Sequence, residues 1–219
     1  MAQCSHVVIV LHGFGDECTW SNWIKVVEPL YKVGCSLIVL DLPGFGRSSG
    51  RDTIQSSWKQ NGPEIYVAIL SSFGINKPIS VLAECGGAAT SIRAINRYPR
   101  WFQDRHHLFN NSVTGDFGDS YPGEFEQKLV KYNIHILVTW KVDIDHPTFC
   151  VAYKRWDKNR KSGFKNLRLV DLPQTAYRTD WVKVNNIARL TSKNKAFFYV
   201  NTPEREKLII HAISPNAKL

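Results

Sequence analysis

The sequence predicts an α/β fold, a mostly parallel, twisted sheet of about six to seven strands with helices on both faces. Short continuous apolar runs alternate with longer segments whose apolar residues recur at helical spacing. Continuous apolar runs are typical of strands buried on both faces, as in a parallel sheet. Glycine-rich turns follow three of these runs, at 12–15, 41–46 and 83–87, and should converge at the carboxyl ends of the strands.

The predicted strands are short and rich in branched apolar residues. In chain order they are Val7–Leu11, Ser36–Leu40, Ile79–Leu82, His107–Phe109 with 112–113, Ile134–Trp140 and Leu167–Leu172. The β-rich run Phe197–Val200 is the candidate for a seventh strand.

Helices are predicted between these strands. Apolar spacing predicts a helix over Trp20–Val33, which Gly34 ends as a C-cap. A second is expected over Pro63–Phe73, with proline in its first turn. The remaining predicted helices run from Ala88 to just before Pro99, over Glu124–Tyr132, and onward from Thr202.

Length and composition favour one domain over residues 1–219. The chain is 43% hydrophobic and has no apolar run long enough to span a membrane. Its start has neither a basic region nor a cleavage site typical of a signal peptide. Its five cysteines are odd in number and never form C-x-x-C, which favours reduced thiols and a cytoplasmic location. We expect no cofactor and no metal site.

The net charge of +9 is concentrated in the second half of the chain. Residues 154–168 carry seven Lys or Arg side chains against the single acid Asp157, with Trp156 and Phe164 among them. Such a basic face could bind an anionic partner, such as nucleic acid or acidic lipid. We favour the simpler interpretation of a solvated helix face.

Cys85 stands in the pattern expected of a nucleophile at a sharp strand-to-helix turn. The strand Ile79–Leu82 ends at the small residue Ala83, Glu84 intervenes, and two glycines follow the cysteine. Small residues are needed at the flanking positions because the turn brings neighbouring chain segments close. A thiol there is exposed at a helix N-terminus, which favours a thiolate. The alternative is an inert, buried cysteine at a strand–helix junction.

Three motifs in this order resemble the α/β-hydrolase superfamily: His-Gly-Phe-Gly at 12–15, Asp-Leu-Pro-Gly-Phe-Gly-Arg-Ser at 41–48, and the turn around Cys85. The resemblance covers residues 7–172. Relative to the eight-stranded sheet of that family, the chain starts at the third strand and is expected to lack the antiparallel edge strands.

The resemblance implies an acyl-transfer site. The backbone N–H groups of Phe14 and Gly86 would form the oxyanion hole, and Cys85 would be the nucleophile, as in dienelactone-hydrolase-like members. The triad acid would be Asp145, with Asp143 as the alternative. Both carboxylates and His146 also suggest a metal site, an interpretation that we disfavour because no fourth ligand is in view. His12 is expected to brace its loop rather than act as a base.

The general base is missing from its expected place. The loop after Leu167–Leu172 has no histidine, and Tyr177 stands near the family position. A tyrosine with a pKa of about 10 cannot activate a thiol at neutral pH. His211 and His146 are the remaining candidates, while an ionised Glu84 would raise the pKa of the thiol.

Two functional hypotheses follow. The first is a hydrolase in which Cys85 attacks a small ester, thioester or lactone, with impaired activity if the base is lost. The second is an inactive relative that binds a ligand or a protein partner. A third hypothesis, a redox-responsive Cys85, lacks a second cysteine nearby in the sequence. The interval 114–133 is too short for a full helical cap, which favours a compact substrate.

Overall fold

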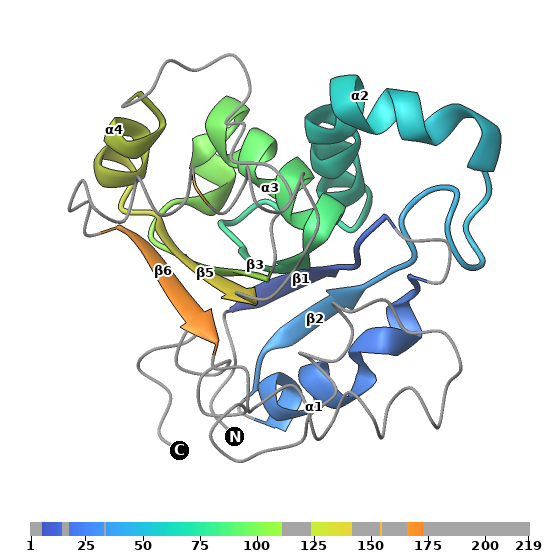
Figure 1. The fold of residues 1–219 in the computed structure, drawn as a ribbon, viewed down its shortest axis with the longest axis horizontal. Coiled ribbons are helices and arrows are strands. Elements are labelled where there is room, and N and C mark those ends of the chain that lie inside the picture. The colour runs from blue at the N-terminus through green and yellow to red at the C-terminus, as the bar shows by residue number, and fades with distance from the viewer. Residues whose placement is uncertain are drawn as a thin grey trace.

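Six parallel strands form one twisted sheet in the order β2-β1-β3-β4-β5-β6 (Figure 1). The computed structural model describes residues 6–14, 18–32, 34–110, 124–141, 154 and 166–172. The strands are β1 (Val7–Leu11), β2 (Ser36–Val39), β3 (Ser80–Glu84), β4 (His106–Asn110), β5 (His135–Lys141) and β6 (Leu167–Leu172). Each neighbouring pair is parallel, which confirms the predicted sheet.

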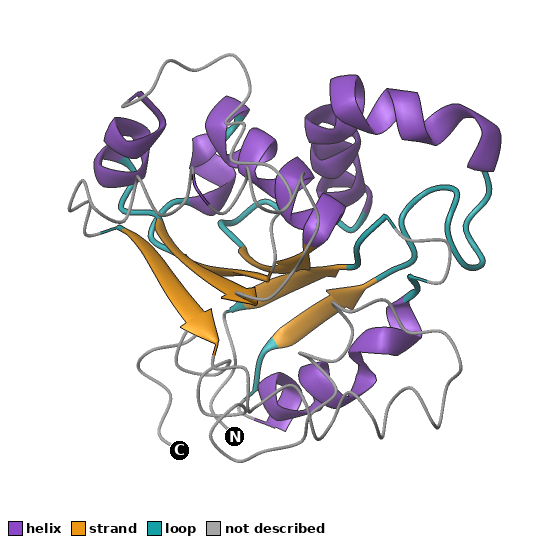
Figure 2. Ribbon diagram, in the orientation of Figure 1, coloured by secondary structure: helices purple, strands orange, loops and turns teal. Residues whose placement is uncertain are grey.

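Helices lie on both faces of this sheet, as predicted. The segment η1 (Trp20–Trp23) leads into α1 (Ile24–Lys32) on one face (Figure 2). The other face carries α2 (Arg51–Ser72), α3 (Cys85–Arg97) and α4 (Glu124–Lys131). A short turn of 3-10 helix, η2 (Pro99–Phe102), follows α3.

The central strands β1 and β3 are buried along their whole lengths. Ile9, Val81 and Leu82 expose none of their surface, because helices cover the sheet on both sides. Burying one such side chain contributes roughly 1.5–3 kcal/mol relative to exposure. Phe125 of α4 also belongs to this core, so its role is packing.

The boundaries of α2 and α3 differ from those predicted. The helix expected to begin at Pro63 begins at Arg51, so the proline lies inside α2. Proline lacks an N–H and crowds the preceding turn, which bends a helix (Figure 1). Residues 51–62 carry no clear apolar periodicity, so the sequence did not predict this half. In turn, α3 begins at Cys85 itself rather than at Ala88.

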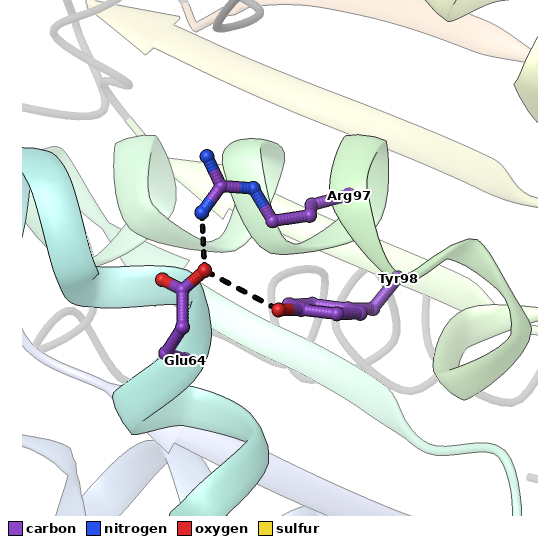
Figure 3. A network of polar contacts seen from close by, with 3 residues as sticks. All are labelled: Glu64, Arg97 and Tyr98. Atoms are coloured by element: carbon purple, nitrogen blue, oxygen red, sulfur yellow. Dashed lines mark hydrogen bonds and ion pairs between the residues drawn. The ribbon is translucent and has the colours of Figure 1, made fainter.

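A polar cluster joins α2 to α3 at the surface (Figure 3). The guanidinium of Arg97 pairs with the carboxylate of Glu64, and the Tyr98 hydroxyl donates to the same oxygen at 3.3 Å. Burial raises the pKa of Glu64, but its hydrogen bonds and the charge of Arg97 outweigh burial and lower it. Exposed pairs of this kind typically contribute about 0–1 kcal/mol, so the cluster adds little to stability.

The first turn of α3 packs against the loop that follows β1. A Cβ added at Gly87 would lie 2.4 Å from the carbonyl oxygen of His12. A Cβ added at Gly86 would lie 2.4 Å from the ring of Phe14. Both glycines are therefore required by close approach rather than by backbone flexibility.

Histidines gather at the amino ends of the strands, opposite Cys85. His6 precedes β1 and contacts the Ser80 hydroxyl at 2.6 Å, while the rings of His106 and His135 stack at 4.6 Å. Burial lowers the pKa of His107 to about 3, and burial followed by Arg105 lowers that of His6 to about 4. Both imidazoles are therefore neutral in the fold.

Several predictions fall outside the described residues. They are the strand extension at 112–113, the run Phe197–Val200 and the helix from Thr202. The expected lack of antiparallel edge strands and the single domain over 1–219 stay predictions.

We expect Gly87→Ala to destabilise the protein by about 3 kcal/mol, because the added methyl group meets backbone that cannot easily move. Chemical denaturation would measure the free energy of unfolding. Gly74→Ala is the control: its φ is +66° and an added Cβ meets no atom within 4 Å. That variant should lose about 1 kcal/mol from backbone strain alone. Equal losses in the two variants would contradict the close approach at Gly87.

We expect acid to destabilise the fold through His107. Its pKa is lowered to about 3 in the fold, so the unfolded chain binds the proton more readily below about pH 6.5. Stability should be unaffected above that pH and should fall as the pH drops towards 3, with a loss of about 2 kcal/mol at pH 5. His107→Leu should remove this loss, whereas the partly exposed His135→Gln should not. Parallel stability curves for His107→Leu and the wild type would contradict this.

Candidate functional site

Cys85 lies at the carboxyl end of β3 and is the first residue of α3. Its φ is 49°, in the left-handed region that residues with a Cβ rarely adopt. Holding a cysteine there costs about 1–3 kcal/mol, which the packing of the surrounding segments must offset. The residue is partly buried and in the thiol form. The sharp strand-to-helix turn predicted at this position is therefore present.

Two backbone N–H groups converge on the sulfur of Cys85. They belong to Phe14, in the loop after β1, and to Gly86, the next residue of α3, and both hydrogen bonds favour the thiolate. These are the two residues that the family resemblance nominated as oxyanion donors. Two such donors at one point form a small pocket of positive potential beside the sulfur.

Aromatic packing holds the loop of Phe14 in place. The rings of Phe14 and Phe45 stack with centroids 5.8 Å apart, and Phe45 also meets the ring of His12 edge-on at 5.1 Å. Because Gly86 has no side chain, the Phe14 ring can lie directly against the start of α3. The Phe14 N–H is therefore positioned by contacts from both sides.

His12 uses both ring nitrogens to brace this region. Its Nε2 accepts a hydrogen bond from the Leu42 N–H at 2.9 Å, which places the proton on Nδ1. That Nδ1 donates to the carbonyl of Gly13 at 2.6 Å. The side chain is 1% exposed. His12 thus links the loops after β1 and β2, and the expectation that it braces its loop rather than acts as a base is confirmed.

Asp41 organises the second glycine-rich loop. Its carboxylate accepts the N–H of Trp20 at 2.7 Å and that of Arg47 at 2.9 Å. The Ser48 hydroxyl donates to the backbone carbonyl of Asp41 at 2.8 Å. Gly46, at φ +53°, must lack a Cβ because the Asp41 carboxylate occupies that place. The loop is a rigid support for Phe45 and, through it, for Phe14.

The surroundings of Cys85 raise the pKa of its thiol to about 12. Burial is the main cause, the nearby carboxylate of Glu84 is the second, and the two backbone N–H groups oppose them. Glu84 is 5% exposed. With such a pKa, about one sulfur in 10⁵ is a thiolate at pH 7. The described surroundings therefore hold the nucleophile as a neutral thiol.

No histidine of the described residues is placed to accept the proton of Cys85. His6, His106, His107 and His135 lie at the opposite end of the sheet, and both nitrogens of His12 are engaged. Asp143, Asp145, His146, Tyr177 and His211 lie outside the described residues. Their roles stay predictions.

The basic stretch 154–168 is described only at 154 and 166–168, so its role as a partner site also stays a prediction. The described part of the chain contains no cluster of three or more candidate metal ligands. Within it, no helix combines the length and apolar character needed to cross a membrane.

Sequence reasoning missed one residue at this site, Cys18. It is 4% exposed, and its thiol lies close enough to raise the pKa of Cys85. No spacing pattern links the two cysteines. The available signal was that Cys18 follows the 12–15 loop, which the resemblance places beside Cys85.

Comparison with known sequences finds similarity in the N-terminal part of the chain. Residues 6–105 match the sequence model of a family described as alpha/beta hydrolase fold. A relative in Escherichia coli O81 (strain ED1a), named 2-hydroxy-6-oxononadienedioate/2-hydroxy-6-oxononatrienedioate hydrolase, is 31% identical over 100 residues. That match covers 44% of this chain and 33% of the relative, so the chain aligns with about a third of it.

Solved structures resemble a larger part of the chain. The 2-hydroxy-6-oxo-6-phenylhexa-2,4-dienoate hydrolase from Rhodococcus sp. strain RHA1 aligns with a TM-score of 0.58 and 17% identity, over 84% of this chain and 89% of that one. The serine hydrolase CCSP0084 from Cycloclasticus zankles also has a TM-score of 0.58, with 14% identity over 85% and 92%. At these identities the likeness establishes the fold. Together with the family match over residues 6–105, it shows that the chain has the alpha/beta hydrolase fold.

Proposed function

We propose that the protein hydrolyses a small ester, thioester or lactone through Cys85. The observation that carries this proposal is the convergence of the Phe14 and Gly86 N–H groups on the sulfur of a cysteine held at positive φ. A buried structural cysteine requires neither feature. An acyl-transfer nucleophile requires both, because its attack creates negative charge beside it.

In the proposed reaction, the sulfur of Cys85 attacks the substrate carbonyl carbon. The electron pair of the C=O bond moves to oxygen. The Phe14 and Gly86 N–H groups, which first donate to the sulfur, then donate to this oxyanion. Each donor typically stabilises the transition state by about 3 kcal/mol. Collapse of the intermediate expels the alcohol or thiol, and water then cleaves the acyl–sulfur bond.

The Cys85 thiol has a pKa of about 12, which determines how it can attack the substrate in the first step. The thiol must lose its proton during the attack, as a serine hydroxyl does, because little thiolate exists beforehand. A general base is therefore needed. We keep His211 and His146 as its candidates and Asp145 or Asp143 as the acid that orients it.

The proposed substrate class is broad because the match to the curated relatives covers only part of their length. The curated relatives are named for substrates that carry an oxo group, but the match covers a third of their length. The part of the chain that matches the family model includes Phe14 and Cys85 and no residue beyond 105. We therefore propose a compact carbonyl substrate, which also suits the short interval at 114–133.

We expect Cys85→Ala to lower hydrolysis of p-nitrophenyl acetate by about 10³-fold or to the buffer background, because it removes the sulfur that forms the acyl intermediate in the proposed reaction. Release of p-nitrophenol would give the rate. Mass spectrometry should find the acetyl group on the Cys85 peptide of the wild-type protein. Cys35→Ala is the matched control, since Cys35 is a buried thiol that precedes β2 at the far end of the sheet. Turnover that survives Cys85→Ala would refute the proposal.

A binding scaffold is the second candidate function, and the raised pKa of the Cys85 thiol favours it. An enzyme that depends on a preformed thiolate would keep this pKa low. The same strand-to-helix turn, with Glu84 beside the sulfur, could instead support a ligand or a protein partner. The basic stretch 154–168 would then be a docking face for an anionic partner.

The pH dependence of Cys85 alkylation by iodoacetamide, taken together with the acetylation of Cys85, distinguishes the two candidates. From the described surroundings, we expect an apparent pKa well above the usual 8.5 of a cysteine, and slow alkylation at neutral pH. Glu84→Gln should lower that pKa and accelerate alkylation, because it removes the negative charge next to the sulfur. Alkylation of Cys35 in the same samples controls for unfolding.

An apparent pKa near 7 would mean that an imidazole or another cation lies beside the sulfur, which would favour the hydrolase. A high pKa together with no acetyl adduct on Cys85 would favour the scaffold. If Glu84→Gln leaves the pKa unchanged, the assigned effect of Glu84 is wrong.

A further inference from the structure

A second thiol lies beside the candidate nucleophile. The sulfur of Cys18 and the sulfur of Cys85 lie 3.7 Å and 3.8 Å from the point where a Cβ on Gly13 would be. The two cysteines come from different segments, the stretch before η1 and the start of α3, and the loop after β1 brings them together. The two sulfurs are therefore at most 7.5 Å apart, the sum of these two distances, and the Cys18 thiol is near enough to raise the pKa of Cys85.

Gly13 lies against both cysteines, and its lack of a side chain allows this approach. A Cβ there would approach the Cβ of Cys85 to 3.0 Å, which is tighter than most real contacts. A disulfide requires an S–S distance of about 2.05 Å, so the sulfurs must move towards each other. The staggered χ1 wells give each sulfur alternative positions, so rotamer changes at the two cysteines are the movement that would bring the sulfurs together.

We propose that Cys18 and Cys85 form a reversible disulfide when the protein meets a hydroperoxide, and that this bond blocks the nucleophile. Formation of the bond is independent of the proposed hydrolysis, whereas its effect on turnover rests on that function. Cys85 has no second cysteine close to it in the sequence, but the fold brings Cys18 near it.

The chemistry balances with hydrogen peroxide as oxidant. Cys85 is the partly exposed thiol, so its sulfur attacks one peroxide oxygen; the O–O bond breaks, and water and a sulfenic acid form. The Cys18 thiol then attacks the Cys85 sulfur, the S–S bond forms, and the hydroxyl leaves as a second water. The two thiols lose two electrons and two protons, and the peroxide is reduced to water.

The surroundings predict how fast this occurs. Burial and Glu84 hold Cys85 as a thiol, so oxidation should be slow at neutral pH and should accelerate as the pH rises. Cys18 is buried, so it should react with the neighbouring sulfenic acid rather than with peroxide in solution. The pair is therefore expected to respond to sustained rather than brief exposure to oxidant.

The test treats the full-length protein with hydrogen peroxide, blocks remaining thiols with iodoacetamide and maps the peptides without reduction. We expect a Cys18–Cys85 linked peptide, two hydrogens lighter than the sum of its parts, that dithiothreitol separates. Cys18→Ala should give no linked peptide and should instead accumulate a Cys85 sulfenic acid that dimedone traps. Cys18→Ser is the second variant if the alanine variant folds poorly. Cys35→Ser should behave as the wild type.

The two proposals fail separately. A linked peptide in a protein whose reduced form has no hydrolase turnover would support the disulfide and refute the hydrolase. The disulfide would be refuted if the reduced protein turns over substrate and peroxide then oxidises Cys85 without ever linking it to Cys18. If both proposals hold, turnover should fall in proportion to the linked fraction and return with dithiothreitol. In Cys18→Ala, turnover should not follow a linked fraction in this way.

Discussion

The close approach of α3 to the loop after β1 is the constraint on which this site depends. The carbonyl of His12 and the ring of Phe14 occupy the places where side chains at Gly87 and Gly86 would lie. This contact sets the positive φ of Cys85 and brings two N–H groups to its sulfur. Interiors are packed closely enough that one methyl group at this point would displace backbone. The site is thus a consequence of packing between the neighbouring parallel strands β1 and β3 and the segments that follow them.

The electrostatics of Cys85 combine opposing effects. Two backbone donors favour a negative sulfur, while burial and the neighbouring Glu84 disfavour it more strongly. The donors are then poised for charge that appears during a reaction rather than for charge at rest, which is the arrangement that lowers a barrier. This arrangement also leaves the Cys85 thiol unreactive until a base, a ligand or an oxidant acts on it. The reaction of the thiol therefore depends on which group approaches it.

Polar groups are distributed unequally over the two ends of the sheet. The carboxyl ends carry the braced loops, where His12 and Asp41 satisfy backbone N–H groups. The amino ends carry neutral histidines whose pKa values burial lowers, His107 most of all. The side chains that brace loops by hydrogen bonds therefore lie at the candidate site, and the buried histidines that make the fold sensitive to acid lie at the opposite end.

The sequence by itself determined the α/β sheet, its strands and the Cys85 turn, because apolar runs and glycine spacing are local signals. It misplaced the start of α2, because residues before Pro63 lack an apolar period. The tertiary structure decided which groups His12 binds, that burial is the main cause of the raised pKa of Cys85, and that Cys18 is its neighbour. These facts join segments distant in the chain, and burial and proximity are properties of the folded chain rather than of any local pattern.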